Sequence, residues 1–205
     1  QVHEAIDSGI NLLNGEVLEK ITIEELEKIF KGNIEMPMLQ ERVEILNAVG
    51  TKLVDNYEGD WLKFINQGPR RLYSDGEGLI ERLVLEFPRF NDSSLYLEKE
   101  VNFYKLAQLA FWGIHGELAH TGHFEIEDME SMTAFADYIV PVALIVMKIT
   151  KYSEELEEKI LNGKMIERNS TEEVEIRAAS IYATAKLTES VNRRRENAGS
   201  IILPQ

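Results

Sequence analysis

Three helix-start signals constrain what this sequence can fold into more than any other feature. Each is a capping box, in which glutamate follows serine or threonine three residues later. The boxes are Thr22 with Glu25, Ser74 with Glu77, and Ser170 with Glu173. Apolar residues recur behind each box at the spacing of one helix face, and strand-like alternation is confined to residues 200–203. The pattern predicts an all-α fold, with roughly eight to ten helices packed around one core.

Caps and helix breakers place further elements. Asp60 is expected to cap a short helix, Pro88 to end the helix behind the second box, and Pro141 to open another. Residues 89–99 are predicted to form a loop. A long amphipathic helix is predicted from the third box to about Arg195.

The amino-acid composition excludes several classes of protein and of ligand. The chain has 205 residues, 44% of them apolar, which predicts one domain over residues 1–205. The absence of cysteine excludes disulfide scaffolds, thiolate zinc sites and cysteine nucleophiles. With 22 basic and 36 acidic residues, the formal net charge is −14. This acid excess argues against nucleic-acid binding, which needs a basic surface, whereas a small anion needs only one or two cations.

The sequence shows no membrane span or export signal. The longest apolar run, residues 139–147, is too short to cross a bilayer and contains Pro141. The first residues are not a basic-then-apolar signal. We therefore expect a cytoplasmic protein with no membrane partner. The chain begins at Gln1 rather than methionine and stops after an apolar run, which is expected of a fragment or a processed form.

Three neighbouring histidines, His115, His120 and His123, suggest a zinc site. Their spacing does not match the two-histidine helical signature, which needs a gap of four with glutamate beside the first histidine. Gly116 and Gly122 are also expected to interrupt any helix here. We predict a polar loop and no metal, and a metal-dependent hydrolase is the least favoured functional alternative.

Asp137 is a candidate reactive group. It lies among aromatic and aliphatic residues, and Pro141, four residues later, cannot donate an amide hydrogen to its carbonyl. The backbone at Asp137 is therefore expected to leave a helix just as a new one begins. A carboxylate near a helix N-terminus in an apolar wall can act in catalysis, or it can simply cap the helix. The residues alone favour neither interpretation.

Two further features carry charge on predicted helices. Lys105 lies on a helix whose other face is apolar, where most lysines are solvated. Glu173 and Arg177 are four residues apart and can pair along a helix, which mainly adds stability.

Four segments in register resemble those of the queuosine salvage proteins, the queuosine 5′-phosphate N-glycosylase/hydrolases. They are residues 37–47 (PMLQERVEILN), 103–108 (FYKLAQ), 135–141 (FADYIVP) and 173–177 (EVEIR). The resemblance covers nearly the whole chain. It implies a helical fold like that of DNA glycosylases and hydrolysis of queuosine 5′-monophosphate, with release of the 7-deazaguanine base queuine for tRNA modification.

The resemblance also implies site residues. Asp137 and Lys105 correspond to the family's catalytic aspartate and lysine, and no cofactor is implied. Phe135, Tyr138 and Tyr104, together with Asp137, are expected to bind the substrate. The implied partner is a small nucleotide rather than a nucleic acid.

The chain departs from the family pattern in two ways. Ile139 and Val142 stand where arginine and glutamine are usual. Family members also extend further at both ends, so residues 1–205 are expected to be a single helical domain that is truncated at both ends. The alternative function is a non-catalytic helical module that binds a nucleoside or queuine and lacks the terminal active-site acids.

Overall fold

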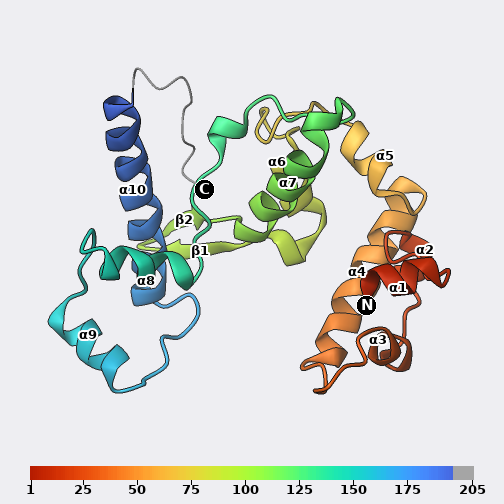
Figure 1. Ribbon diagram of the computed structural model, residues 1–205, viewed down its shortest axis with the longest axis horizontal. Helices are drawn as coiled ribbons and strands as arrows, with labels where there is room; N and C mark the ends of the chain where they lie inside the picture. The colour runs from red at the N-terminus through yellow and green to blue at the C-terminus, as the bar shows by residue number, and fades with distance from the viewer. Residues whose placement is uncertain (196–205) are drawn as a thin grey trace. The chain divides into compact units, whose positions relative to one another are not determined.

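The computed structural model describes residues 1–195, which divide into two compact units (Figure 1). Unit 1 comprises residues 1–70 and 74–89, and unit 2 comprises residues 71–73 and the described chain from residue 90 onward. Helices dominate both units, as predicted. One small sheet is also present, so the described chain is mostly helical rather than all-α.

Unit 1 is built around one long helix, α4. Its helices are α1 (Val2–Asp7), α2 (Gly15–Leu18), α3 (Ile23–Ile29), α4 (Leu39–Tyr57), α5 (Trp61–Asn66) and α6 (Leu79–Glu86). Leu26 of α3 and Val43 of α4 belong to one buried cluster. Helix α4 also packs so closely on α2 that a Cβ at Gly50 would come within 2.1 Å of the backbone nitrogen of Glu19, the residue that ends α2. That contact requires glycine at this position.

Local signals fix two helix starts in unit 1 as predicted. Thr22 and Glu25 form the reciprocal bonds of a capping box at α3. The Asp60 carboxylate accepts a hydrogen bond of 2.8 Å from the Leu62 amide at α5. Both predictions are confirmed.

The capping box predicted at Ser74 and Glu77 is wrong. Helix α6 begins later, at Leu79, and its capping carboxylate is Glu81. Glu81 Oε2 accepts hydrogen bonds from the Gly78 amide at 2.9 Å and from the Ser74 amide at 2.7 Å. The intervening chain turns at Gly76, whose φ is +95°, so it cannot begin a helix there.

Unit 2 combines a hairpin with helices. Its elements are β1 (Ser93–Tyr96), β2 (Lys99–Asn102), α7 (Lys105–Leu118), α8 (Ile139–Val146), α9 (Glu154–Leu161), α10 (Thr171–Arg194) and the short 3-10 turns η2 (Ala119–Thr121) and η3 (Met129–Ser131). Another 3-10 turn, η1 (Pro88–Phe90), follows α6, which ends as predicted before Pro88. Ser170 caps α10 as predicted, and Pro141 lies in the first turn of α8.

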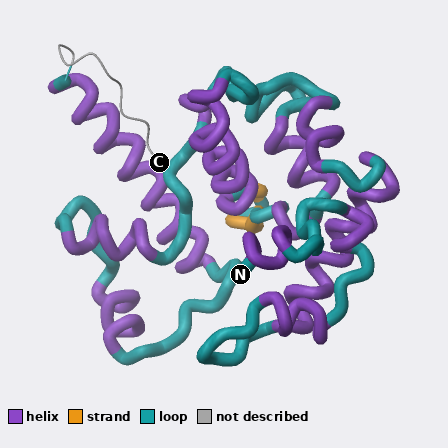
Figure 2. Tube along the Cα trace, turned by 45° about the vertical axis from the view of Figure 1, so that its right-hand side comes forward, coloured by secondary structure: helices purple, strands orange, loops and turns teal. Residues whose placement is uncertain are grey.

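The hairpin corrects the prediction of a loop over residues 89–99. Strands β1 and β2 pair in antiparallel register from Ser93 with Asn102 to Tyr96 with Lys99 (Figure 2, orange). Each strand has only four residues, too few for their alternation to stand out. The strand considered at residues 200–203 lies outside the described residues.

The hairpin, α8 and α10 surround the core of unit 2. Phe103, Ala136 and Val174 form a buried cluster against which Tyr96 and Ile181 pack. Helix α10 contacts both α8 and β1, and Figure 1 shows it running past them. The segments carrying residues 103, 136 and 174 therefore meet in one place. Among residues 1–195, no helix combines the length and the apolarity needed to cross a membrane.

Candidate functional site

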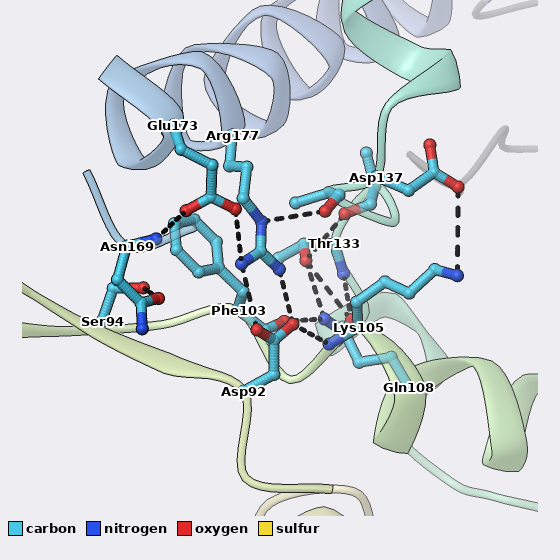
Figure 3. Close-up of polar contacts among 12 residues, drawn as sticks. Asp92, Ser94, Phe103, Lys105, Gln108, Thr133, Asp137, Asn169, Glu173 and Arg177 are labelled. Atoms are coloured by element: carbon cyan, nitrogen blue, oxygen red, sulfur yellow. Dashed lines mark hydrogen bonds and ion pairs between the residues drawn. The ribbon is translucent and has the colours of Figure 1, made fainter. Parts of the chain in front are cut away.

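Asp137 uses its two carboxylate oxygens in different ways. It lies just before α8, where Oδ1 accepts hydrogen bonds from the amides of Ile139 at 2.9 Å and Val140 at 3.3 Å. Oδ2 lies 4.0 Å from the Lys105 ammonium (Figure 3). The carboxylate therefore caps the first turn of α8 and also presents one oxygen to a cation.

Lys105 is the first residue of α7 and extends towards Asp137. Its side chain and that of Asp137 are 24% and 29% exposed, so a ligand can reach both. Lys105 is thus paired rather than simply solvated, which sequence spacing could not show. Its backbone amide donates a hydrogen bond of 3.3 Å to Asp92 Oδ2, which fixes the start of the helix.

A buried ion pair between Arg177 and Asp92 adjoins these two residues. Arg177 Nη1 donates to Asp92 Oδ1 at 3.0 Å, and Nη2 makes a short bond to Oδ2. Arg177 Nε donates to the Ala136 carbonyl at 3.0 Å, and its guanidinium lies 3.9 Å from the centre of the Phe103 ring. The predicted bond to Glu173 is present at 3.4 Å but is only one of these contacts.

The pair also sets the ionisation of Asp92. Burial opposes the charged form, but the hydrogen bonds and the positive charge of Arg177 outweigh it and lower the pKa of Asp92 below its usual value. Sequence reasoning missed Asp92 because 85 residues separate it from Arg177. No local pattern joins the two.

Gln108 is a second residue that sequence reasoning missed. It is buried, its Nε2 donates to the Phe103 carbonyl at 2.9 Å, and its Oε1 accepts from the Thr133 amide at 2.8 Å. These bonds attach the segment before Asp137 to α7. A polar residue on the apolar face of α7 was the available signal.

A cavity of about 610 Å³ opens beside Asp137. Its walls come from α8, α9 and α10 and are mostly apolar. The polar and charged side chains in its lining are Asp137, Tyr138, Tyr152, Glu173 and Arg177. Such a space, apolar with a few convergent polar groups, has the character of a small-molecule site.

The aromatic residues expected at the substrate lie in different settings. Tyr138 lines the cavity and is 79% exposed. Phe135 packs against Trp112, with ring centres 6.0 Å apart in an edge-to-face arrangement. Tyr104 precedes Lys105 in a left-handed conformation, with φ of 48°. Of these three, only Tyr138 contributes to the described lining of the cavity.

None of the three histidines is among the residues that line this cavity. Helix α7 continues through Gly116, so the predicted interruption there is wrong, whereas Gly122 does end the short turn η2. His115 Nδ1 accepts a hydrogen bond of 3.0 Å from the Ile126 amide. Within residues 1–195, no group of three or more histidines and acids is placed to hold a metal ion.

Known proteins resemble this chain over nearly its whole length. The family model described as queuosine salvage protein matches residues 1–203. Queuosine 5′-phosphate N-glycosylase/hydrolase of Mus musculus is 32% identical over 183 residues, covering 88% of this chain and 53% of that protein. The protein of the same name from Sphaerobacter thermophilus is 32% identical over 190 residues, covering 93% and 58%.

A relative of lower identity covers more of this chain. The Schizosaccharomyces pombe protein of that name is 28% identical over 215 residues, covering 98% of this chain and 58% of that protein. The chain thus spans between half and three-fifths of the length of these curated relatives. Because the family model and the relatives agree across nearly all of its residues, the chain belongs to the queuosine salvage protein family.

Proposed function

We propose that this chain hydrolyses the N-glycosidic bond of queuosine 5′-monophosphate and releases queuine. The observation that carries the proposal is the placement of Asp137. Its carboxylate is anchored on one oxygen, faces Lys105 with the other, and borders a cavity of about 610 Å³. The relatives' printed name supplies the substrate class.

The reaction needs an anion near the sugar. Cleavage of an N-glycosidic bond builds positive charge on the ribose ring, and a carboxylate beside the anomeric carbon stabilises it or attacks it. Queuine has carbon where purines have N7, so protonation at that position cannot assist its departure. Stabilisation of the sugar cation must therefore contribute more, and we assign it, or a contact to the base, to Asp137.

Lys105 suits a contact to phosphate or sugar oxygens. Its ammonium lies 4.0 Å from Asp137 Oδ2, at the outer limit of an ion pair. It can therefore bind a ligand oxygen without breaking a short hydrogen bond. A lysine ammonium is a compact charge that suits a single phosphate.

The aromatic residues are proposed to hold the base. Tyr138 offers an exposed ring beside Asp137, and Phe135 is oriented by its edge contact with Trp112. Tyr104 adjoins Lys105 in sequence. Flat rings contribute large contact areas to a planar ligand. No step of this proposal uses a cofactor.

The finer predictions of the sequence remain proposals. They are a helical arrangement like that of DNA glycosylases, one domain over residues 1–205, and a cytoplasmic location. The mostly helical chain and its family membership support the first. A free nucleotide, rather than a nucleic acid, is proposed as the partner because the net charge of −14 repels polyanions.

A binding module without catalysis is the second candidate. The observation that favours it is coverage, since the chain matches only 53% to 58% of the length of the relatives named above. Such a module would keep the cavity and bind queuine or its nucleoside without cleaving the bond.

The test is turnover by the purified chain. Queuosine 5′-monophosphate is incubated with the chain, and free queuine is measured by chromatography with mass detection. Asp137→Asn should lower the rate about 100-fold or more, because it removes the charge that meets the sugar cation. The control is Asp60→Asn, which alters another aspartate whose carboxylate accepts the amide two residues later at the start of a helix, in unit 1, and should change the rate less than about twofold.

The outcomes separate the two candidates. Release of queuine that persists at full rate in Asp137→Asn would contradict the assignment of Asp137. Binding of the nucleotide without release, in a chain of confirmed mass, would favour the binding module.

A further inference from the structure

Arg177 contacts both segments that carry the proposed catalytic groups. Its Nε donates to the carbonyl of Ala136, the residue directly before Asp137, at 3.0 Å. Its two terminal nitrogens bind the Asp92 carboxylate. Figure 3 shows the Arg177 guanidinium directed towards Asp92.

Asp92 carries the connection on to Lys105. Its Oδ2 accepts the Lys105 amide at 3.3 Å. Its backbone carbonyl accepts the amides of Phe103 at 2.9 Å and Tyr104 at 3.1 Å. Every residue from 103 to 105 is thus bonded to Asp92, which makes it the fixed point for the start of α7.

The shape of arginine is needed for this connection. A planar guanidinium can bind a carboxylate with two parallel bonds, donate a further bond from Nε, and stack on a ring. Arg177 does all of these, with the Phe103 ring 3.9 Å from its central carbon. The side chains of Arg177 and Asp92 are only 11% and 16% exposed, so solvent weakens the bonds little.

We propose that Arg177 and Asp92 are positioning residues that set the distance between Lys105 Nζ and Asp137 Oδ2. They act through the backbone on each side of the pair, from Ala136 to Asp137 and from the α7 start to Lys105. The catalytic consequence rests on the proposed function. The geometric claim does not, so the two can be tested separately.

The geometric test monitors the ionic contact directly. The lysines of the full 205-residue chain are labelled with ¹³C-methyl groups, and Lys105 is assigned by its loss in Lys105→Arg. The Lys105 signal should change its chemical shift when Asp137→Asn is introduced, because that substitution removes the charge that faces the ammonium. This change in chemical shift is called the Lys105 step below.

In each of the two positioning variants, adding Asp137→Asn should no longer change the Lys105 signal. Asp92→Asn keeps the size of the side chain but removes the charge that Arg177 binds. Arg177→Lys keeps the positive charge but loses the planar guanidinium that forms two parallel bonds to Asp92. Circular dichroism checks that each variant is folded. If Arg177→Lys fails to fold, Asp92→Asn still decides the question.

Arg82→Lys is the matched control. Arg82 is also a buried arginine, in unit 1, with its guanidinium 4.6 Å from the centre of the Phe64 ring. It donates to the carbonyls of Phe64 at 2.9 Å and Glu77 at 3.2 Å. Its replacement should lower the melting temperature but leave the Lys105 step intact. A general loss of stability is thereby separated from a change in position.

Kinetics supply the second measurement. For queuosine 5′-monophosphate, Asp92→Asn should lower kcat about 10- to 100-fold, as expected when reacting groups are displaced by about an ångström. Arg82→Lys should leave kcat within about twofold. Failure of the wild-type chain to release queuine would contradict the proposed function alone, because the Lys105 signal still reports the geometry.

The proposal is overturned by either of two results. One is a wild-type Lys105 signal without a step linked to Asp137. The other is a step that survives unchanged in folded Asp92→Asn.

Discussion

At the scale of single residues, the two oxygens of the Asp137 carboxylate make different contacts. Oδ1 is held by two amides at the start of α8, while Oδ2 faces Lys105. Capping restricts rotation of the carboxylate, so the second oxygen is presented in a fixed direction. Preorganisation of this kind lets a charged group stabilise a transition state without first having to reorient.

Tyr57 yields a prediction about stability at high pH. Its hydroxyl donates its one hydrogen to the Glu86 carboxylate, whose two oxygens lie 2.8 and 2.6 Å away. Burial, and then the hydrogen bond and negative charge of Glu86, raise the pKa of Tyr57 to about 12 from the usual 10.0. The folded chain therefore holds this proton more tightly than the unfolded chain. The resulting stabilisation, roughly 3 kcal/mol, is complete below pH 10 and is lost as the pH rises from 10 to 12.

Urea unfolding between pH 9 and about 12 measures this effect. Tyr57→Phe should be less stable than the wild type near pH 9, but it should lose less stability than the wild type as the pH is raised. Tyr182→Phe, which removes a hydroxyl from an exposed tyrosine on α10, is the control. Parallel curves for the wild type and Tyr57→Phe would show that the Tyr57 hydroxyl does not hold its proton as described.

At the scale of elements, the turn of the β1–β2 hairpin carries strain. Leu97 and Glu98 form the two-residue loop, and both have positive φ, 48° and 63°. This conformation favours asparagine and glycine, and side chains such as leucine adopt it at a cost of about 1–2 kcal/mol. The double substitution Leu97→Asn with Glu98→Gly should therefore stabilise unit 2 by roughly 1 kcal/mol.

Thermal unfolding measures the change. The control is Leu85→Asn, since Leu85 is 79% exposed, like Leu97 at 78%, but lies within α6. This control tests whether removing an exposed leucine is by itself enough to raise the melting temperature. Equal melting temperatures for the wild type and the double variant would contradict the prediction.

The start of a helix could be predicted where the capping residues lie next to that helix in the sequence. The boxes at Thr22 and Ser170 lie next to the helices they start, and both were confirmed. At Ser74 the signal was equally local but wrong, because Glu81, seven residues away, accepts the Ser74 amide instead. A competing acceptor one turn into the helix cannot be distinguished from sequence spacing alone.

The site was only partly predictable for the same reason. Asp137 and Lys105 were singled out, and the structure brings them together. Asp92 was missed because its partner Arg177 is 85 residues away. The hairpin that carries the chain from Asp92 to Phe103 was also missed. Tertiary packing, rather than local preference, decides such contacts.

At the scale of the whole molecule, charge limits what the chain can bind. Its formal net charge is −14, with 22 basic residues against 36 acidic ones. Proteins that bind nucleic acid neutralise several phosphates and release counterions, which requires a basic surface. A single nucleotide carries one phosphate, and one ammonium such as that of Lys105 can meet it. The proposed function therefore does not require contact with a nucleic acid.

We therefore expect the chain to act on the free nucleotide and not to bind tRNA. Fluorescence anisotropy with labelled tRNA should give a Kd weaker than about 10⁻⁴ M at physiological salt, outside the usual range for non-specific nucleic-acid binders. If the proposed function holds, an excess of tRNA should likewise leave hydrolysis of queuosine 5′-monophosphate unchanged, because the proposed contact to its phosphate is a single lysine, Lys105. Tight binding that weakens steeply as salt is raised would contradict this, since that slope counts phosphates neutralised by the protein.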